Sequence, residues 1–191
     1  MIRCYITDRR TLASGTLLDS IARNLAAGVE WIQIREKDLS ARALFELVEA
    51  ACKLPNPHGS PNGTRFIVNT RADVALAAAA AGVHLPSGSP PARVWRRTGS
   101  LTDLLIGVSC HSLEEVQAAE DDGADYALFG PVFAPLSKSG LDPKGLDALA
   151  RATAAVRIPV LALGGVTRAN TAACISAGAA GVAAISMFQS C

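Results

Sequence analysis

The sequence lacks any strong imbalance of charge, because 18 Lys and Arg residues stand against 17 Asp and Glu residues and leave a formal net charge of +1. A chain without a large positive field is not expected to bind nucleic acid through the phosphate backbone. Charged residues make up only 18% of the chain and hydrophobic residues 50%, which excludes a disordered protein. A chain of 191 residues can build one sizeable core, so we expect a single domain over residues 1–191.

Closely spaced cysteine pairs are also missing. Cys4, Cys52, Cys110, Cys174 and Cys191 lie far apart, which argues against a disulfide framework and against a zinc site. We expect the first four to be buried thiols of a cytoplasmic protein. The N-terminus lacks the apolar stretch of a signal peptide. The uncharged stretch 169–191 is too rich in small residues for a membrane anchor, so no membrane partner is expected.

Short apolar runs alternate with helical patterns along the whole chain. The runs predict strands at residues 3–6, 31–35, 66–69, 82–85, 105–109, 126–130, 159–163 and 181–186. Helices are predicted at residues 17–27, 41–53, 72–81, 92–97, 113–122, 146–156 and 168–177. Ser40 and Ser112 are suited to cap the second and fifth helices, with Glu115 as a capping-box partner of Ser112. A left-handed glycine is expected after four of the helical runs, at Gly28, Gly82, Gly123 and Gly178.

This strict alternation predicts a (β/α)8 TIM barrel, because parallel strands need helical crossovers. An open doubly wound sheet is the alternative, but no Gly-x-Gly-x-x-Gly motif follows the first strand. The sequence stops directly after the predicted eighth strand, so we expect the eighth helix to be absent. The surface that this helix would cover is then exposed, repacked, or covered by a partner, as in a homodimer.

Reactive residues of such a barrel follow the carboxyl ends of its strands. Gly164 and Gly165 follow the predicted seventh strand and open the next helix, and Ser186 ends the eighth strand. Free backbone N–H groups beside glycines and a helix N-terminus suit an anion. These three residues therefore predict a phosphate site, with a plain tight turn as the alternative.

A second polar group follows the second strand. Gln33, Arg35 and Lys37 alternate along an extended segment and share one face, where two cations and an amide suit phosphate or carboxylate. The alternative is a salt bridge with Asp8 or Glu36. Two further strand-end residues, Asn69 and Lys138, complete the predicted substrate-binding set.

Two histidines also lie at strand ends. His111 follows the fifth strand, and the ordinary histidine pKa of about 6.5 suits proton transfer near neutral pH, so His111 is the candidate catalytic residue. His84 is flanked by Val83 and Leu85 and is expected to make a structural hydrogen bond. The spacing shows neither a Ser-His-Asp arrangement nor a metal-ligand cluster.

Over nearly its whole length the sequence resembles the thiamine phosphate synthase superfamily. The matching segments are residues 5–8, 33–38, 81–85, 107–112, 124–126, 129–133 and 163–166. The synthases of this family join a thiazole phosphate to a pyrimidine diphosphate with magnesium. A second branch, the TenI-type thiazole tautomerases, aromatises a thiazole phosphate carboxylate.

Departures from the synthase pattern favour the second branch. Thr70 replaces the first acid of that pattern and Ser89 the second, and these two carboxylates hold the magnesium of the synthases. The loop at 135–138 is altered too. Residues 85–89 and 109–115 resemble the tautomerases, whose acid/base histidine falls at His111. The intact group of Gln33, Arg35 and Lys37 resembles the diphosphate site of the synthases instead.

We therefore expect a thiazole tautomerase, an isomerase of thiamine biosynthesis that acts on a phosphorylated thiazole without metal or other cofactor. Arg35 or Lys138 would stabilise negative charge on the substrate carboxylate. Two alternatives stay open. One is a magnesium-dependent thiamine phosphate synthase, and the other is a non-catalytic barrel that binds thiazole phosphate or thiamine phosphate.

Overall fold

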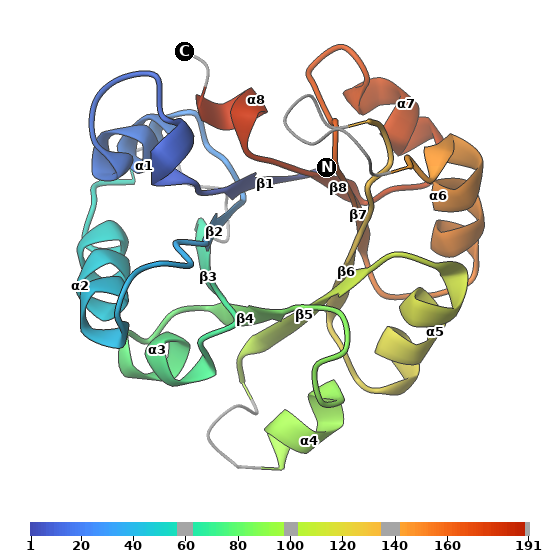
Figure 1. Ribbon diagram of the computed structural model, residues 1–191, viewed down its shortest axis with the longest axis horizontal. Coiled ribbons are helices and arrows are strands. Elements are labelled where there is room, and N and C mark those ends of the chain that lie inside the picture. The colour runs from blue at the N-terminus through green and yellow to red at the C-terminus, as the bar shows by residue number, and fades with distance from the viewer. Residues whose placement is uncertain (57–62, 98–102, 135–141, 190–191) are drawn as a thin grey trace.

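The computed structural model of the protein describes residues 1–56, 63–97, 103–134 and 142–189. In these residues eight parallel strands pair in chain order and close into a barrel, with β8 beside β1 (Figure 1). The strands are β1 (Ile2–Ile6), β2 (Trp31–Ile34), β3 (Arg65–Asn69), β4 (Gly82–Leu85), β5 (Leu105–Cys110), β6 (Tyr126–Phe129), β7 (Val160–Leu163) and β8 (Gly181–Ala184). The predicted barrel is confirmed, and the predicted strand ends differ from these bounds by at most two residues.

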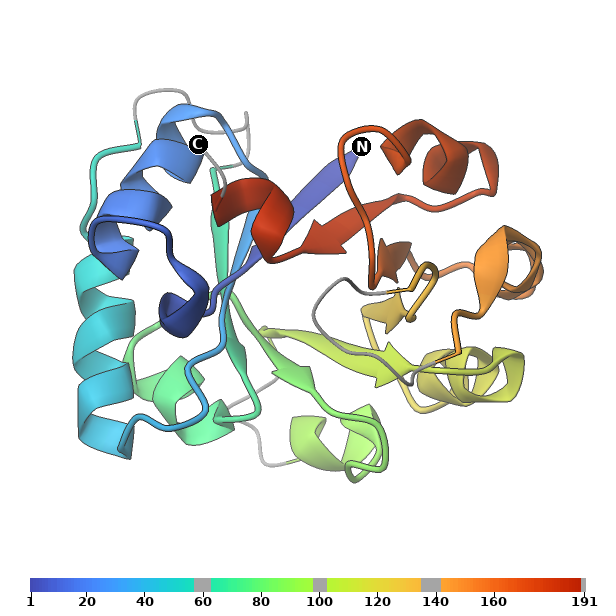
Figure 2. The ribbon, with the colours of Figure 1, turned by 45° about the horizontal axis from the view of Figure 1, so that its top comes forward.

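Helices surround the barrel and follow the strands in turn (Figure 2). They are α1 (Leu17–Ala26), α2 (Ala41–Cys52), α3 (Ala72–Ala77), α4 (Ala92–Arg96), α5 (Leu113–Asp121), α6 (Gly145–Ala154), α7 (Thr171–Ser176) and α8 (Ser186–Gln189), and a 3-10 helix spans Arg9–Thr11. The two predicted caps are confirmed. Ser40 Oγ accepts from the N–H of Ala43, and Ser112 Oγ accepts from the N–H of Glu115, both at 3.2 Å.

Side chains that alternate along the strands fill two separate cores, one inside the barrel and one between the strands and the helices. The inner core consists of Cys4, Ile6, Trp31, Ile67, Tyr126, Leu128, Leu161 and Ala183. The Tyr126 ring lies edge-on to Trp31, with ring centroids 4.7 Å apart. The same ring lies against Gly107 of β5, where a Cβ atom would overlap it. Only glycine at 107 therefore leaves room for this tyrosine.

The C-terminal end of the barrel departs from the prediction. The eighth strand ends at Ala184, and a short helix, α8, begins at Ser186, where the sequence predicted no helix. Asn24 of α1 donates to the carbonyl oxygen of Phe188 at 3.1 Å, and Gln189 donates to the Tyr5 hydroxyl at 3.2 Å. The helix therefore covers part of the surface for which we expected exposure, repacking or a partner. Beside it is a groove of about 410 Å³, lined in part by Met1, Ala27, Val29, Val182 and Met187.

One predicted helix end is also different. Positive φ angles of 68°, 82° and 89° confirm three of the predicted left-handed glycines, Gly28, Gly123 and Gly178. Gly82 instead begins β4, and the left-handed residue at this joint is Ala79, with φ 50°. A Cβ atom at Gly82 would lie 2.6 Å from the carbonyl oxygen of Leu105. The close approach of β5 therefore explains this glycine, and a helix cap does not.

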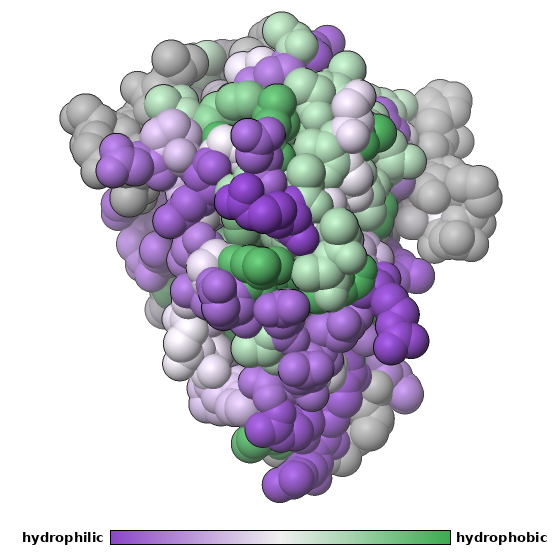
Figure 3. Space-filling view, turned by 90° about the vertical axis from the view of Figure 1, so that its right-hand side faces the viewer, coloured by the Kyte–Doolittle hydropathy of each residue, from purple (hydrophilic) through white to green (hydrophobic). Residues whose placement is uncertain are grey.

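The outer face over α5, α6 and α7 is mixed in character, with hydrophilic residues dominating its lower part (Figure 3). Among the helices of the described residues, none has the length and hydrophobicity that a bilayer span requires. The cysteines in this part of the chain are free thiols. Cys4, Cys110 and Cys174 are buried as predicted, but Cys52 is exposed. Cys191 lies outside the described residues.

Candidate active site

The barrel mouth gathers polar side chains from neighbouring strands. On β2, Trp31 packs inside the barrel, so Gln33, two residues on, also points inward. Asn69 at the end of β3 pairs with His84 on β4, and His84 pairs with Gly107 on β5. The register therefore places the polar ends of three strands in one ring above the apolar inner core.

Gln33 and Asn69 are brought together as a hydrogen-bonded pair. Gln33 is 1% exposed, and its Nε2 donates to Asn69 Oδ1 at 3.0 Å. Asn69 Nδ2 in turn donates to Thr70 Oγ1 at 2.8 Å. Gln33 Oε1 is buried and accepts no hydrogen bond from the described residues. A buried acceptor of this kind is costly without a donor, so it is suited to an N–H or O–H group of a ligand.

Arg35 and Lys37 keep their positive charges free of the acids that we considered as their partners. Glu36 is 5% exposed and is occupied by Thr7 Oγ1 at 2.7 Å and by the Arg9 guanidinium at 2.9 Å. Within the described residues, neither Arg35 nor Lys37 forms an ion pair, so the alternative of a salt bridge with Asp8 or Glu36 is not found.

The same arginine also neutralises the acid that follows Lys37. Arg9 and Arg10 pair with Asp38 at 2.5 and 2.8 Å. The hydrogen bond from Arg9 holds the pKa of Asp38 well below its usual range. Lys37 is exposed and lines a cavity of about 330 Å³ together with Asn69 and Thr70. The acids around the second strand are therefore paired with arginines of the first loop, which leaves this side of the mouth cationic.

His84 makes the structural hydrogen bonds that the sequence predicted. It is 2% exposed, with Nδ1 3.1 Å from the Tyr126 hydroxyl and Nε2 2.8 Å from Ser109 Oγ. Burial, and secondarily the charge of Arg35, lower the pKa of His84 to about 3. The imidazole is therefore neutral at physiological pH. The contact of Tyr126 with His84 was not predicted from the sequence, although the alternation of side chains along β6 indicates that Tyr126 points into the barrel.

The opposite side of the mouth is built from backbone. Gly164 and Gly165 line a cavity of about 320 Å³ with Ser186, Asp8 and Thr11, which brings the three residues of the predicted phosphate site together. The two glycines have φ angles of 91° and 62°. Among the described residues, no atom accepts a hydrogen bond from the N–H of Gly165. Backbone donors that line a cavity are suited to the oxygens of an anion.

Tight packing and an asparagine hold this backbone in place. A Cβ atom at Gly165 would lie 2.7 Å from Phe133 Cβ, so the loop after β6 closes against it. Asn170 Nδ2 donates to the carbonyl oxygen of Gly165 at 2.9 Å, and its Oδ1 accepts from the N–H of Thr167 at 2.7 Å. The helix expected to open at this point begins only at Thr171. The prediction that a helix N-terminus contributes to this site is therefore wrong.

His111 is exposed at the end of the fifth strand. Its Nδ1 lies 2.6 Å from the carbonyl oxygen of Gly130, so this nitrogen carries a proton and donates it. The backbone N–H of His111 donates to Glu115 Oε2 at 2.8 Å, so this carboxylate serves His111 and not Ser112 as the sequence suggested. The remaining predicted residue, Lys138, lies outside the described residues.

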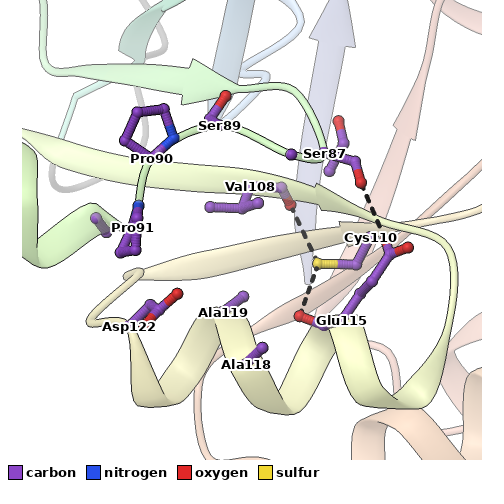
Figure 4. A pocket seen from close by; sticks show the side chains of 13 residues that line it. Ser87, Ser89, Pro90, Pro91, Val108, Cys110, Glu115, Ala118, Ala119 and Asp122 are labelled. Atoms are coloured by element: carbon purple, nitrogen blue, oxygen red, sulfur yellow. Dashed lines mark hydrogen bonds between the residues drawn. The ribbon is translucent and has the colours of Figure 1, made fainter.

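The donor atoms present do not fit a magnesium site. Thr70 and Ser89 stand where the resemblance implies carboxylates, and they line two cavities that share no residue. Two carboxylates line the cavity of Ser89: Glu115 is bound by His111 N–H and by Ser87 Oγ at 3.3 Å, and Asp122 is paired with Arg93 (Figure 4). The described residues hold no cluster of three or more metal-ligating side chains. Because Mg²⁺ prefers carboxylate oxygens, we assign no protein-bound metal to this mouth.

Comparison with known proteins relates the chain to thiamine-phosphate synthases. The family described as thiamine monophosphate synthase matches residues 4–188. The thiamine-phosphate synthase of Chlorobium luteolum is 44% identical over 97% of this chain and 84% of its own, and that of Roseiflexus castenholzii is 43% identical over 95% and 78%. The solved structure of thiamine phosphate pyrophosphorylase from Pyrococcus furiosus is 33% identical, with a TM-score of 0.85 over 100% of this chain and 88% of that chain.

These relatives overturn one expectation. The prediction of a thiazole tautomerase is wrong, because relatives at 43–44% identity over nearly the whole chain are named synthases. Synthases of this kind are transferases and not isomerases. The proton shift that the resemblance to the tautomerases implied for His111 falls with the tautomerase, whereas a catalytic role of His111 from its place at a strand end stays a prediction. With a match over residues 4–188, the chain belongs to the thiamine monophosphate synthase family.

Proposed function

We propose that this protein is a thiamine-phosphate synthase that joins a thiazole phosphate to a pyrimidine diphosphate. The observation that carries the proposal is the presence of two separate anion-suited regions at one barrel mouth. Lys37 lines a cavity in one of them, with Arg35 two positions before it in the chain, and the glycine cavity of Gly164, Gly165 and Ser186 forms the other. Two phosphorylated substrates need two such regions, and the relatives at 43–44% identity are named synthases.

In the proposed reaction a bond forms between the thiazole and the pyrimidine, and the bond from the pyrimidine to its diphosphate breaks. The electron pair of the broken bond leaves with the diphosphate, whose negative charge grows in the transition state. Arg35 and Lys37 are the residues that we assign to this charge, because cations stabilise a leaving anion most when no carboxylate neutralises them. We assign none of these bond changes to a protein-bound metal ion.

The remaining predicted residues take complementary places. We assign the thiazole phosphate to the backbone N–H of Gly165 and the surrounding cavity. Gln33 Oε1 would accept a hydrogen bond from a donor group of the pyrimidine, which would satisfy this buried acceptor. Asn69 holds Gln33 through the 3.0 Å hydrogen bond and positions it. We also propose a cytoplasmic location, which suits the free thiols of the described residues.

The decisive experiment is an assay with both phosphorylated substrates that measures thiamine phosphate and released diphosphate, with added Mg²⁺ and with EDTA. We expect equal amounts of the two products, and none when either substrate is omitted. Arg35→Gln should lower the rate, while Arg42→Gln, at an exposed arginine of α2, should leave it unchanged. Binding of both substrates with no release of diphosphate under either condition would overturn the proposal in favour of a binding barrel.

A further inference from the structure

Three side chains form a continuous hydrogen-bonded row from the inner core to the mouth. Tyr126 of β6 is fully buried, His84 of β4 is 2% exposed, and Ser109 of β5 is half-buried at the mouth. The Tyr126 hydroxyl lies 3.1 Å from His84 Nδ1, and His84 Nε2 lies 2.8 Å from Ser109 Oγ. We call this the Tyr126–His84–Ser109 row. The direction in which each hydrogen bond is donated decides what Ser109 offers to a substrate.

The buried end of the row fixes the first direction. Burial raises the pKa of Tyr126 well above its ordinary value, so its hydroxyl keeps its proton. Within the described residues, His84 Nδ1 is the only hydrogen-bond partner of that hydroxyl. A buried O–H that donates to nothing costs free energy, so the Tyr126 hydroxyl donates to Nδ1. It follows that His84 Nδ1 carries no proton.

The imidazole then fixes the second direction. His84 is neutral, because burial and the nearby Arg35 lower its pKa to about 3. A neutral imidazole has one proton, and with Nδ1 bare that proton is on Nε2. Nε2 therefore donates to Ser109 Oγ at 2.8 Å. The proton of the Ser109 hydroxyl is not used inside the row and remains available at the mouth.

We propose that Tyr126 and His84 are positioning residues that make Ser109 a hydrogen-bond donor toward an anionic oxygen of the substrate. Arg35 lies near enough to His84 to act on its charge, so the same part of the mouth carries a cation and an O–H donor. The opposite direction along the row would turn a lone pair of Ser109 toward the mouth and would repel an anion. The identity of the anion rests on the proposed function, whereas the direction of the row does not.

The direction can be measured by NMR on protein labelled with ¹⁵N-histidine, without any substrate. The chain has three histidines, and the His84 signals are assigned by their loss in His84→Gln and their retention in His111→Gln. We expect a protonated Nε2, a bare Nδ1, and no titration between pH 5.5 and 8.5. A proton on Nδ1, or a titration near the ordinary pKa of about 6.5, would overturn the inference.

The effect on binding is measured with inorganic diphosphate as the probe. Ser109→Ala should weaken its affinity by about 10- to 100-fold, as for a lost hydrogen bond to a charged group. Tyr126→Phe leaves the tautomer of His84 unfixed and should weaken binding by about 3- to 10-fold, as for a neutral hydrogen bond. In the Ser109→Ala background, Tyr126→Phe should have no further effect, because it acts through Ser109.

Tyr5→Phe is the matched control. Tyr5 is also fully buried, and its hydroxyl lies 3.0 Å from Ser20 Oγ, outside the row. This variant should lose stability but keep the His84 tautomer and the affinity for diphosphate. Equal losses of affinity in Tyr5→Phe and Tyr126→Phe, or wild-type affinity in Ser109→Ala, would overturn the inference. The protein could show the expected His84 tautomer and yet form no thiamine phosphate. That combination would overturn the proposed function and leave the direction of the row intact.

Discussion

The two sides of the barrel mouth are suited to anions by different physical means. On the side of β2 and β3, the positive charge belongs to the long side chains of Arg35, which is half-buried, and Lys37, which is exposed. On the side of β7 and β8, the donor is backbone, held by Gly164 and Gly165 against the loop that follows β6. The first side relies on charge and the second on shape.

This difference has consequences for the cost of binding. Side chains such as Arg35 lose rotamer freedom when they close on a ligand, by about 0.5–1.5 kcal/mol each. The backbone of Gly165 is already fixed by Phe133 and Asn170, so it loses little. Charge acts at a distance and suits a leaving group whose charge changes, whereas a rigid cradle suits a phosphate that stays unchanged. In the proposed reaction, the mouth would therefore separate the group that reacts from the group that only anchors.

The largest effect is expected where shape is destroyed. Gly165→Val places a β-branched side chain at φ 62° with its Cβ 2.7 Å from Phe133 Cβ. We expect the affinity for the thiazole phosphate to fall by at least about 100-fold, and the free energy of unfolding by about 2–4 kcal/mol, as for other strained and overpacked sites. Calorimetric titration and denaturant unfolding measure the two quantities.

Gly63→Val is the control for backbone strain. Gly63 has φ 74° and no described atom within 4 Å of a Cβ, so it has the strain without the crowding. Its substitution should cost about 1–2 kcal/mol and leave binding unchanged. If Gly165→Val binds the thiazole phosphate as tightly as the wild type, the phosphate is bound elsewhere.

Removing charge on the other side should have the next largest effect. Arg35→Gln should lower kcat/KM for the pyrimidine diphosphate by about 10- to 100-fold, since hydrogen bonds to charged groups contribute about 1.5–3 kcal/mol. The KM for the thiazole phosphate should stay unchanged. Raising the salt concentration should weaken binding of the diphosphate more than that of the thiazole phosphate. Equal sensitivity of both substrates to salt would remove the distinction between the two sides.

The cationic side should also be the one that responds to pH, because it contains His84. Its pKa is about 3 in the folded protein, against about 6.5 when unfolded. A lowered pKa gives stability that is present above pH 6.5 and is lost as the pH falls toward 3. Between pH 7 and 5 the free energy of unfolding should fall by about 2 kcal/mol. His84→Gln should flatten this slope and His111→Gln should not, as measured by urea unfolding at each pH.

The smallest effect concerns the left-handed residues that both sides use. Glycines serve on the side of β7, but on the side of β3 the left-handed residue is Thr70, with φ 67°. A β-branched residue is strained in that conformation, which asparagine tolerates better. Thr70→Asn should raise the free energy of unfolding by about 0.5–1 kcal/mol. Ala79→Asn, at φ 50° and away from the mouth, should give a similar gain if the backbone is its cause.

Much of the fold could be predicted from the sequence, because strand and helix periodicities and turn residues are local signals. The eight strands and the strand-end positions of Gln33, Asn69 and His84 follow from that periodicity. The pairing of Arg9 with Glu36 and Asp38 could not be predicted from that periodicity, because it joins side chains 27 and 29 positions apart. Such contacts depend on how two loops meet in space. The same limit hid the contact between Tyr126 and His84, 42 positions apart.

The error about the reaction has a different origin. The prediction of a tautomerase depended on Thr70 and Ser89, at two positions where the synthase pattern has carboxylates. Neutral hydroxyls at these positions bear on the affinity for a metal ion. They do not report which bond is made or broken, whereas Arg35 and Lys37 bear directly on a diphosphate leaving group. Similarity over the whole chain agrees with those cations and not with the two loop positions.

The space that Gly107 leaves for the Tyr126 ring has a consequence for inheritance. Any larger residue at 107 overlaps that ring, so a lineage that gains one must move Tyr126 or lose it. Losing the tyrosine removes the hydroxyl that sets the proton of His84. A side chain can therefore appear at position 107 only together with a shift or a replacement of Tyr126, so a residue with no functional group is constrained by the tyrosine that it faces.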